Sequence, residues 1–398
     1  MANLYVRTAC FSSTTIFTLT FTPSHHKVKT GKLSKQPLPA SHAHHLCAYH
    51  EADATLTRQA IEDALAAKEE WENMPWHDRA AIFLKAADLI SGKYRYEIMA
   101  ATILGQGKNA WQAEIDAAAE VCFFHSRTPA SSQRPTSYAC ERRGSTHNYS
   151  PSFSNMFDAL TESLLQLSDF FRFGVKCVEE LYSQQPPENS QYSWNRLEYR
   201  PLEGFVLAVS PFNFTAIGGN LAGAPALVGN VVVWKPSSTA TYSNYIIHRI
   251  LLEAGLPPSV IQFVPGPPAH VVTTALGYRE FAGLHFTGST KVFRNLWKEI
   301  GDNVGQGAYK SYPRVVGETG GKNWHLVHQS ADVKNAVLQS VRSAFEYQGQ
   351  FISSSLPSLM LGAQNVDRPE VLSTFKSIRC FVSVAPVQAD AFRGDCEN

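Results

Sequence analysis

Short apolar runs alternate with stretches of helical spacing after residue 199, and this alternation constrains the fold more than any other feature. The apolar runs are 204–209, 231–234, 261–264 and 283–289. Between them lie amphipathic stretches such as 241–256. Strands that are buried on both faces and separated by helices form βαβ units, which assemble into a parallel, doubly wound sheet. The sequence therefore predicts an α/β fold that binds ligands at the carboxyl ends of its strands.

Two segments before this region have different character. Residues 51–120 show helical periodicity, which predicts three or four helices as the N-terminal part of the nucleotide-binding domain. Residues 121–166 are rich in Ser, Pro, Arg and Thr and have no periodicity, and so long a structureless stretch counts against membership of the fold. We interpret 121–166 as an aberrant, low-complexity insert that interrupts one helix. Residues 167–318 then continue the α/β domain.

Composition excludes several classes of protein. Of the 398 residues, 44% are hydrophobic and 17% are charged, which is typical of a globular chain with a large core. A net charge of +1 gives no general attraction to nucleic acid or to a membrane surface. No apolar stretch reaches the roughly 18 residues of a membrane span. Seven scattered cysteines without a CxxC pair favour free thiols over disulfides or a zinc site, and we predict no metal.

The first fifty residues have a composition of their own. They contain no Asp or Glu and many Ser and Thr, which is typical of an organelle transit peptide. A disordered tail explains the same composition equally well. We therefore predict that residues 1–50 lie outside the folded domain.

Two of the predicted strands are followed by polar residues suited to ligand binding. Asn213 follows the first strand, and its side-chain amide can donate to a developing oxyanion. The alternative is an Asn that bonds its own turn. Lys235 and Ser237 follow the second strand and can bond the ribose hydroxyls of a dinucleotide. The alternative there is a solvated lysine before a proline turn.

Two further motifs lie later in the chain. Gly288 and Ser289 precede a helix whose N-terminus can face a pyrophosphate, although a simple helix cap also explains them. Glu318 stands beside paired glycines and can act as a general base, or it is a surface residue in a turn. The ordinary Rossmann fingerprint GxGxxG is absent from the sequence.

Together these motifs resemble the aldehyde dehydrogenase superfamily, in the order Pro-Phe-Asn, Trp-Lys-Pro-Ser, Phe-Thr-Gly-Ser and Glu-x-Gly-Gly-Lys. Within it, the stretches SPFNFTAIGGNLAGAPALVGNVVVWKPS, EAGLPPSVIQFVPG and SAFEYQGQ are similar to the Δ1-pyrroline-5-carboxylate dehydrogenases. Most aldehyde dehydrogenases carry Trp where Phe212 stands. The resemblance covers about residues 51–120 and 167–350.

The resemblance implies N-terminal helices, a Rossmann-like sheet and a catalytic domain that begins with residues 319–350. It also implies NAD-dependent oxidation of L-glutamate γ-semialdehyde, the open form of pyrroline-5-carboxylate, to glutamate in the mitochondrial matrix, with a cysteine thiolate as nucleophile. By motif position Asn213 is similar to the oxyanion donor and Glu318 to the base. The resemblance also implies that Lys235 and Ser237 bind the adenosine ribose, and that Gly288 and Ser289 lie beside the pyrophosphate.

The resemblance breaks after Gln350. The family follows Gly-Gln with one residue and then the nucleophilic cysteine, whereas here Phe351 and Ile352 follow. Residues 351–398 resemble nothing in the remainder of the catalytic domain, including the strand through which the family homo-oligomerises. We therefore expect an incomplete catalytic domain and an inactive chain. A translated intron or alternative splicing explains both this break and the insert 121–166.

Two functional interpretations follow. In the first, the chain is a pyrroline-5-carboxylate dehydrogenase by ancestry that acts on a small aldehyde, and the gene's proper product is the active enzyme. In the second, it is a non-catalytic dinucleotide-binding fragment or the product of aberrant splicing or gene modelling. NADH production from pyrroline-5-carboxylate discriminates between them.

Overall fold

A computed structural model describes residues 30–118, 167–321 and 332–350, with short strands at 16–17, 19–20, 27–28, 324–327 and 358–361. The chain divides into two compact units, Met1–Glu318 and Thr319–Asn398. This division falls where the sequence predicts the catalytic domain to begin. The predicted insert 121–166, and all of the predicted tail 351–398 except 358–361, lie outside the described residues.

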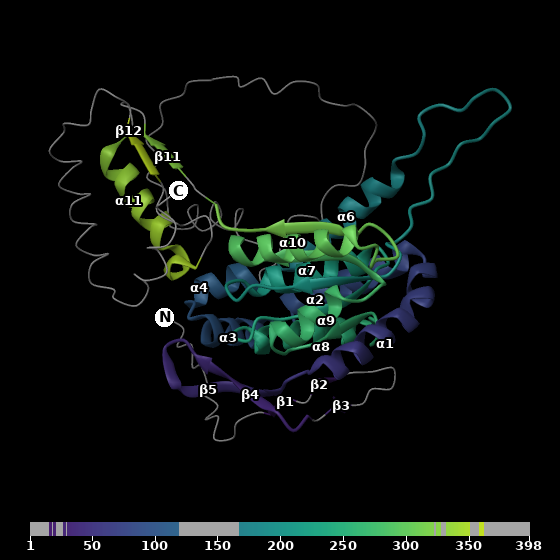
Figure 1. The fold of residues 1–398 in the computed structure, drawn as a ribbon. Helices are drawn as coiled ribbons and strands as arrows, with labels where there is room; N and C mark the ends of the chain where they lie inside the picture. Colours follow the sequence, from purple (N-terminus) through teal and green to yellow (C-terminus); the bar gives the residue numbers. More distant parts are fainter. Residues whose placement is uncertain are drawn as a thin grey trace, which may run out of the picture. The chain divides into compact units, whose positions relative to one another are not determined.

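A five-stranded parallel sheet forms the centre of the first unit (Figure 1). Its strands, in spatial order, are β10 (Arg314–Glu318), β9 (Phe281–Thr287), β6 (Phe205–Val209), β7 (Val231–Lys235) and β8 (Ile261–Phe263). The four predicted strands are present, and the predicted parallel α/β fold is confirmed. β10 was not predicted, because an exposed edge strand of sequence RVVGE lacks the continuous apolar run that marks a buried one.

Helices cover both faces of this sheet. On one face lie α7 (Thr215–Leu227) and α8 (Thr241–Ala254), which follow β6 and β7. On the other lie α9 (Pro268–Leu276) and α1 (Ala54–Asn73), while α10 (Thr290–Gly305) connects β9 to β10. The other helices that the structure describes in the first unit are α2 (Trp76–Ser91), α3 (Arg95–Gln106), α4 (Ala110–Ala113), the π-helical turn η1 (Glu114–Ala118) and α6 (Leu167–Ser183). The helices predicted within 51–120 are thus α1 to α4.

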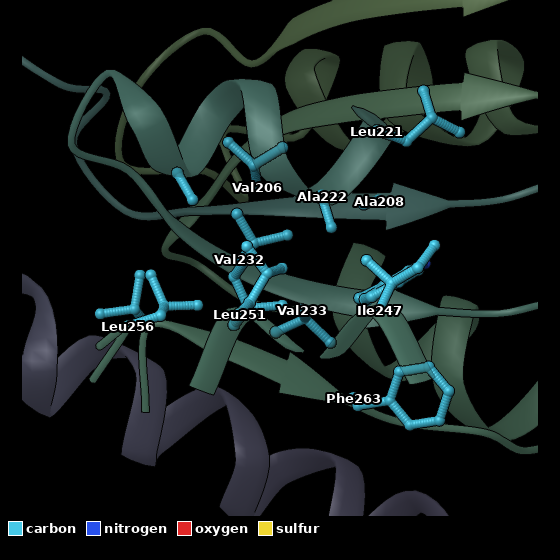
Figure 2. Close-up of a cluster of buried hydrophobic side chains, with 14 of the residues drawn as sticks. Val206, Ala208, Leu221, Ala222, Val232, Val233, Ile247, Leu251, Leu256 and Phe263 are labelled. Atoms are coloured by element: carbon cyan, nitrogen blue, oxygen red, sulfur yellow. The ribbon is translucent and has the colours of Figure 1, made fainter. Parts of the chain in front are cut away.

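The core lies between the sheet and its helices. Figure 2 shows Val206 and Val232 from adjacent strands beside Ile247 and Leu251 of α8, all of them buried. Because helices cover both faces, every residue of β7 is buried. This burial explains why the strands read as continuous apolar runs and do not alternate with polar residues.

An antiparallel hairpin precedes α1 and corrects the prediction for residues 1–50. Its strands are β4 (Leu33–Leu38) and β5 (Ser41–His50). The last four residues of β5 are buried, and the Ala52 amide donates to the Pro265 carbonyl at 2.9 Å. Residues 33–50 are therefore part of the folded unit. The composition of residues 1–50 gave no sign of this hairpin, because composition carries no information about which strands pair.

The second unit contains α11 (Val333–Phe345), the short 3-10 helix η2 (Glu346–Gly349), and two paired strands. These strands, β11 (Trp324–Val327) and β12 (Ser358–Leu361), run parallel. β12 belongs to the predicted tail 351–398, so at least residues 358–361 take part in the second unit's backbone pairing. Tyr347 and Gln348 have φ angles of 51° and 58°, the left-handed region that non-glycine residues rarely adopt.

Burial of His248 in α8 predicts that acid destabilises the first unit. Its Nε2 lies 3.0 Å from the Ile261 carbonyl, and burial lowers its pKa from 6.5 to about 4. Between these values the unfolded chain binds a proton that the folded chain does not, so stability falls on acidification through this window. We expect His248 to account for a loss of about 3 kcal/mol.

Urea unfolding of His248→Gln at pH 7 and pH 4.5 checks this expectation. Glutamine retains an N–H donor for the Ile261 carbonyl without titrating, so the variant should lose less stability on acidification than the native chain. The exposed His77→Gln serves as the control and should behave like the native chain. Equal losses in native chain and His248→Gln would contradict the assignment.

Candidate functional site

The sheet topology brings the predicted site residues to one edge. β6 and β9 are neighbours, yet the chain continues from β6 toward β7 on one side and from β9 toward β10 on the other. Such a reversal creates the crevice in which parallel sheets bind ligands. Val209 at the end of β6 pairs with Lys235 of β7 and with Phe286 of β9. On the other side of β9, Thr287 pairs with Glu318 of β10. The four strand ends are therefore adjacent and aligned.

Lys235 is the last residue of β7, and only 8% of its surface is exposed. Burial lowers the pKa of its ammonium group. Within the described part of the chain, its Nζ has neither a hydrogen bond nor an ion pair, which is unusual for a lysine that is so little exposed. A strand-end cation of this kind is suited to donate to a ligand, so the residues present fit a bound polar group.

Ser237 lies two residues beyond Lys235 and is partly buried. Its hydroxyl is 3.2 Å from that of Thr239, and its carbonyl accepts from the Thr241 hydroxyl at 3.0 Å. The loop that carries Ser237 is thus tied to the first turn of α8. Ser237 therefore lies in the loop that directly follows Lys235 at the end of β7.

Asn213 lies in the loop between β6 and α7 and is buried. The loop begins at Ser210, whose amide donates to the Lys235 carbonyl at 3.2 Å. The Ser210 hydroxyl also accepts from Trp234 Nε1 at 3.0 Å. Asn213 is therefore a buried residue in a loop that is anchored to the strand carrying Lys235.

A buried ion pair that the sequence analysis missed holds the end of this loop. Asp116 accepts from Lys108 Nζ at 2.7 Å, and both side chains are fully buried. The same carboxylate accepts from the amides of Thr215 and Ala216, at 3.0 and 2.9 Å. Asp116 thus caps α7 from a distant segment, in place of Phe214, whose apolar side chain cannot. The available signal was an acidic residue between apolar residues in the predicted helix.

Lys108 also contacts the loop directly. Its Nζ lies 3.9 Å from the centre of the Phe214 ring, next to Asn213. Burial lowers the pKa of Lys108, while the Asp116 carboxylate opposes that shift. The Lys108–Asp116 ion pair, the contact of Lys108 with the Phe214 ring and the cap of α7 together fix the backbone around Asn213.

Gly288 and Ser289 lie between β9 and α10. The Ser289 hydroxyl accepts from the Val292 amide at 3.4 Å, which makes Ser289 the cap of α10. A Cβ atom at Gly288 would lie 2.7 Å from the Phe286 ring, so packing alone requires glycine there. Both residues nevertheless flank the N-terminus of α10 at the carboxyl edge of the sheet, and a helix N-terminus favours an anion.

Glu318 ends β10 and is exposed. Its carbonyl accepts from the Gly288 amide at 3.1 Å, so these two predicted site residues are neighbours. The preceding Gly317 leaves room for the ring of Phe293 from α10. The carboxylate of Glu318 is accessible to solvent.

The structure describes two of the seven cysteines, Cys47 and Cys177. Burial raises the pKa of Cys47 to about 12, so its thiol stays protonated at neutral pH. Cys177 is exposed on α6. In the same described residues, no group of three His, Cys, Asp or Glu side chains is arranged to hold a metal ion. No helix there is both long and apolar enough to cross a membrane.

Comparison with known proteins places these features in context. The profile of the aldehyde dehydrogenase family matches residues 30–150 and 154–360. The match thus covers the predicted insert 121–166 except for residues 151–153, includes the β4–β5 hairpin, and continues ten residues past Gln350, where the sequence analysis placed the end of the resemblance.

Several relatives are Δ1-pyrroline-5-carboxylate dehydrogenases. That of Agaricus bisporus is 58% identical over 328 residues, which are 82% of this chain and 51% of the relative. The human mitochondrial protein is 46% identical, with 82% and 50% covered. The chain thus spans about half the length of these relatives. A crystal structure of the Mycobacterium tuberculosis enzyme bound with NAD has a TM-score of 0.73 at 36% identity, covering 93% of this chain and 58% of that one.

Proposed function

Because the chain belongs to the aldehyde dehydrogenase family, we propose that its first unit is the NAD-binding part of a Δ1-pyrroline-5-carboxylate dehydrogenase. The Lys235 side chain at the end of β7 carries this proposal, because it is only 8% exposed and forms no hydrogen bond or ion pair with the residues that the structure describes. The NAD bound by the Mycobacterium tuberculosis relative supports the identity of the ligand.

In this proposal, Lys235 and Ser237 bond the hydroxyls of the adenosine ribose. Gly288 and Ser289 flank the pyrophosphate at the N-terminus of α10, where the partial positive charge of the helix favours an anion. Bound NAD supplies the hydride acceptor. The residues of this chain hold and orient the dinucleotide along the edge of the sheet formed by β7, β6 and β9.

The activity proposed for the complete protein is oxidation of L-glutamate γ-semialdehyde, a small aldehyde, to glutamate. Asn213 donates its side-chain amide to the oxyanion that develops on the aldehyde oxygen. Glu318 takes a proton from the attacking water. Relatives from human and Emericella nidulans are named as mitochondrial, and we propose the mitochondrial matrix for this protein.

Replacing Lys235 with methionine is expected to weaken NAD binding and to stabilise the unliganded fold. Loss of a charge-assisted hydrogen bond should raise the dissociation constant by about 10- to 100-fold. Without ligand, the variant no longer buries a charge that lacks a partner, so its free energy of unfolding should rise.

NAD titrations and urea unfolding of the Lys235→Met variant measure the two effects. The exposed Lys85→Met is the matched control and should leave both quantities unchanged. Unchanged NAD affinity in Lys235→Met would count against the assigned role of Lys235.

A further inference from the structure

Gln36 lies on β4, in the hairpin that precedes α1, and is 1% exposed. It pairs across the hairpin with Cys47, whose thiol lies 3.7 Å from its side-chain oxygen. A buried glutamine needs partners for both its N–H groups and its oxygen. The main hydrogen-bond partners of the Gln36 side chain lie about two hundred residues later in the chain.

The two principal partners lie shortly after β7, one in the loop that follows it and one in the first turn of α8. Gln36 Nε2 donates to the Thr239 carbonyl at 2.7 Å, and its Oε1 accepts from the Tyr242 amide at 2.9 Å. Tyr242 lies in the first turn of α8, whose cap residue is Ala240 and offers no side-chain acceptor. Gln36 therefore supplies the missing cap of α8 and spans the loop between Thr239 and Tyr242.

This loop begins immediately after Lys235 and contains Ser237. Hydrogen bonds of Ser237 with Thr239 and Thr241 connect the loop to itself and to the start of α8. The bonds from Gln36 attach it to a separate element, the hairpin, which restricts its movement relative to the sheet. A loop held in its ligand-bound shape loses less conformational entropy when the ligand binds.

We propose that Gln36 is a positioning residue for dinucleotide binding, which holds the loop 236–240 in the shape that presents Ser237 to the adenosine ribose. This inference rests on the proposed function, because it assumes that Ser237 and Lys235 face that ribose. Gln36 itself touches no ligand.

The test is a double-mutant cycle on NAD affinity in the full chain. Gln36→Met preserves the size of the side chain and removes both bonds, and should raise the dissociation constant for NAD by about threefold to tenfold. If Gln36 acts through Ser237, the same substitution in a Ser237→Ala background should change affinity by less than about twofold. The exposed Gln184→Met is the control and should bind NAD like the native chain.

A second variant protects the test against a folding defect. Gln36→Asn keeps an N–H donor and an oxygen acceptor on a side chain that is one methylene shorter, so it can reach Thr239 and Tyr242 less well and its effect should lie between those of the native chain and Gln36→Met. Thermal unfolding of each variant, with titrations made well below its midpoint, separates loss of stability from loss of affinity.

Three outcomes are distinguishable. Native affinity in both Gln36 variants, or an equal fold-change of Gln36→Met in native and Ser237→Ala backgrounds, overturns the role of Gln36 and leaves the proposed function intact. A folded native chain that binds no NAD overturns both. Loss of affinity that disappears in the Ser237→Ala background supports the inference.

Discussion

Replacing Asp116 with alanine is expected to lower the free energy of unfolding by about 3–5 kcal/mol. The substitution leaves the Lys108 ammonium buried without its counter-ion, since both side chains are fully buried in the native chain. It also deprives the Thr215 and Ala216 amides of their acceptor at the start of α7. Both losses fall on the segment that carries Asn213.

Urea unfolding followed by tryptophan emission measures this effect, since Trp71 and Trp234 are buried in the first unit. Asp78→Ala is the matched control, because Asp78 is an exposed residue in the first turn of α2 and should cost less than about 1 kcal/mol. The double variant Lys108→Met/Asp116→Leu should be less destabilised than Asp116→Ala, because it buries no unpaired charge. A loss below about 1 kcal/mol in Asp116→Ala would contradict the role of the ion pair.

The second large effect is on turnover. The purified chain, mixed with NAD and pyrroline-5-carboxylate, is expected to form no NADH above background. By the resemblance of residues 343–350 to the family motif, Ile352 takes the position expected of the nucleophilic cysteine, and loss of a nucleophile costs on the order of a millionfold in turnover. The hydroxyls of Ser353, Ser354 and Ser355 are far weaker nucleophiles than a thiolate.

NADH absorbance at saturating substrate measures this turnover, with the Agaricus bisporus relative assayed in parallel as the positive control. NADH formed by this chain at a rate close to that of the relative would show that another group supplies the nucleophile. Cys47 is a poor substitute because its buried thiol has a pKa of about 12.

The sequence predicts the parallel sheet because β6, β7, β8 and β9 carry their own local signal. Each is a short apolar run followed by a helix, and this pattern needs no knowledge of distant partners. β10 and the β4–β5 hairpin gave no such signal. β10 is an exposed edge strand, and β4 contains Lys35, Gln36 and Pro37, which read as polar coil.

The candidate site divides in the same way. Asn213, Lys235 and Glu318 could be selected because each stands at or just after a strand end, where parallel sheets bind ligands. The residues that support them could not. Asp116 contacts α7 about a hundred residues later, and Gln36 contacts the loop before α8 about two hundred residues later. Long-range partners of this kind have no periodic signal in a single sequence.

Both supporting residues perform the same task. α7 and α8 begin after Phe214 and Ala240, neither of which can cap a helix with its side chain. Asp116 and Gln36 supply the missing acceptors from other elements. Because distant residues cap α7 and α8, the residues in the loops after β6 and β7 are not needed as helix caps and can contact a ligand. The distant residues also fix the shape of these loops.

The central claim is that the first unit binds NAD at the carboxyl edge of its sheet. Calorimetric titration of NAD into the intact native chain tests this most directly, with ADP-ribose as a competitor that shares the adenosine and pyrophosphate groups. We predict saturable binding of one NAD per chain that ADP-ribose displaces. A chain that unfolds cooperatively, and is therefore folded, yet shows no saturable NAD binding at millimolar concentration would contradict the assignment.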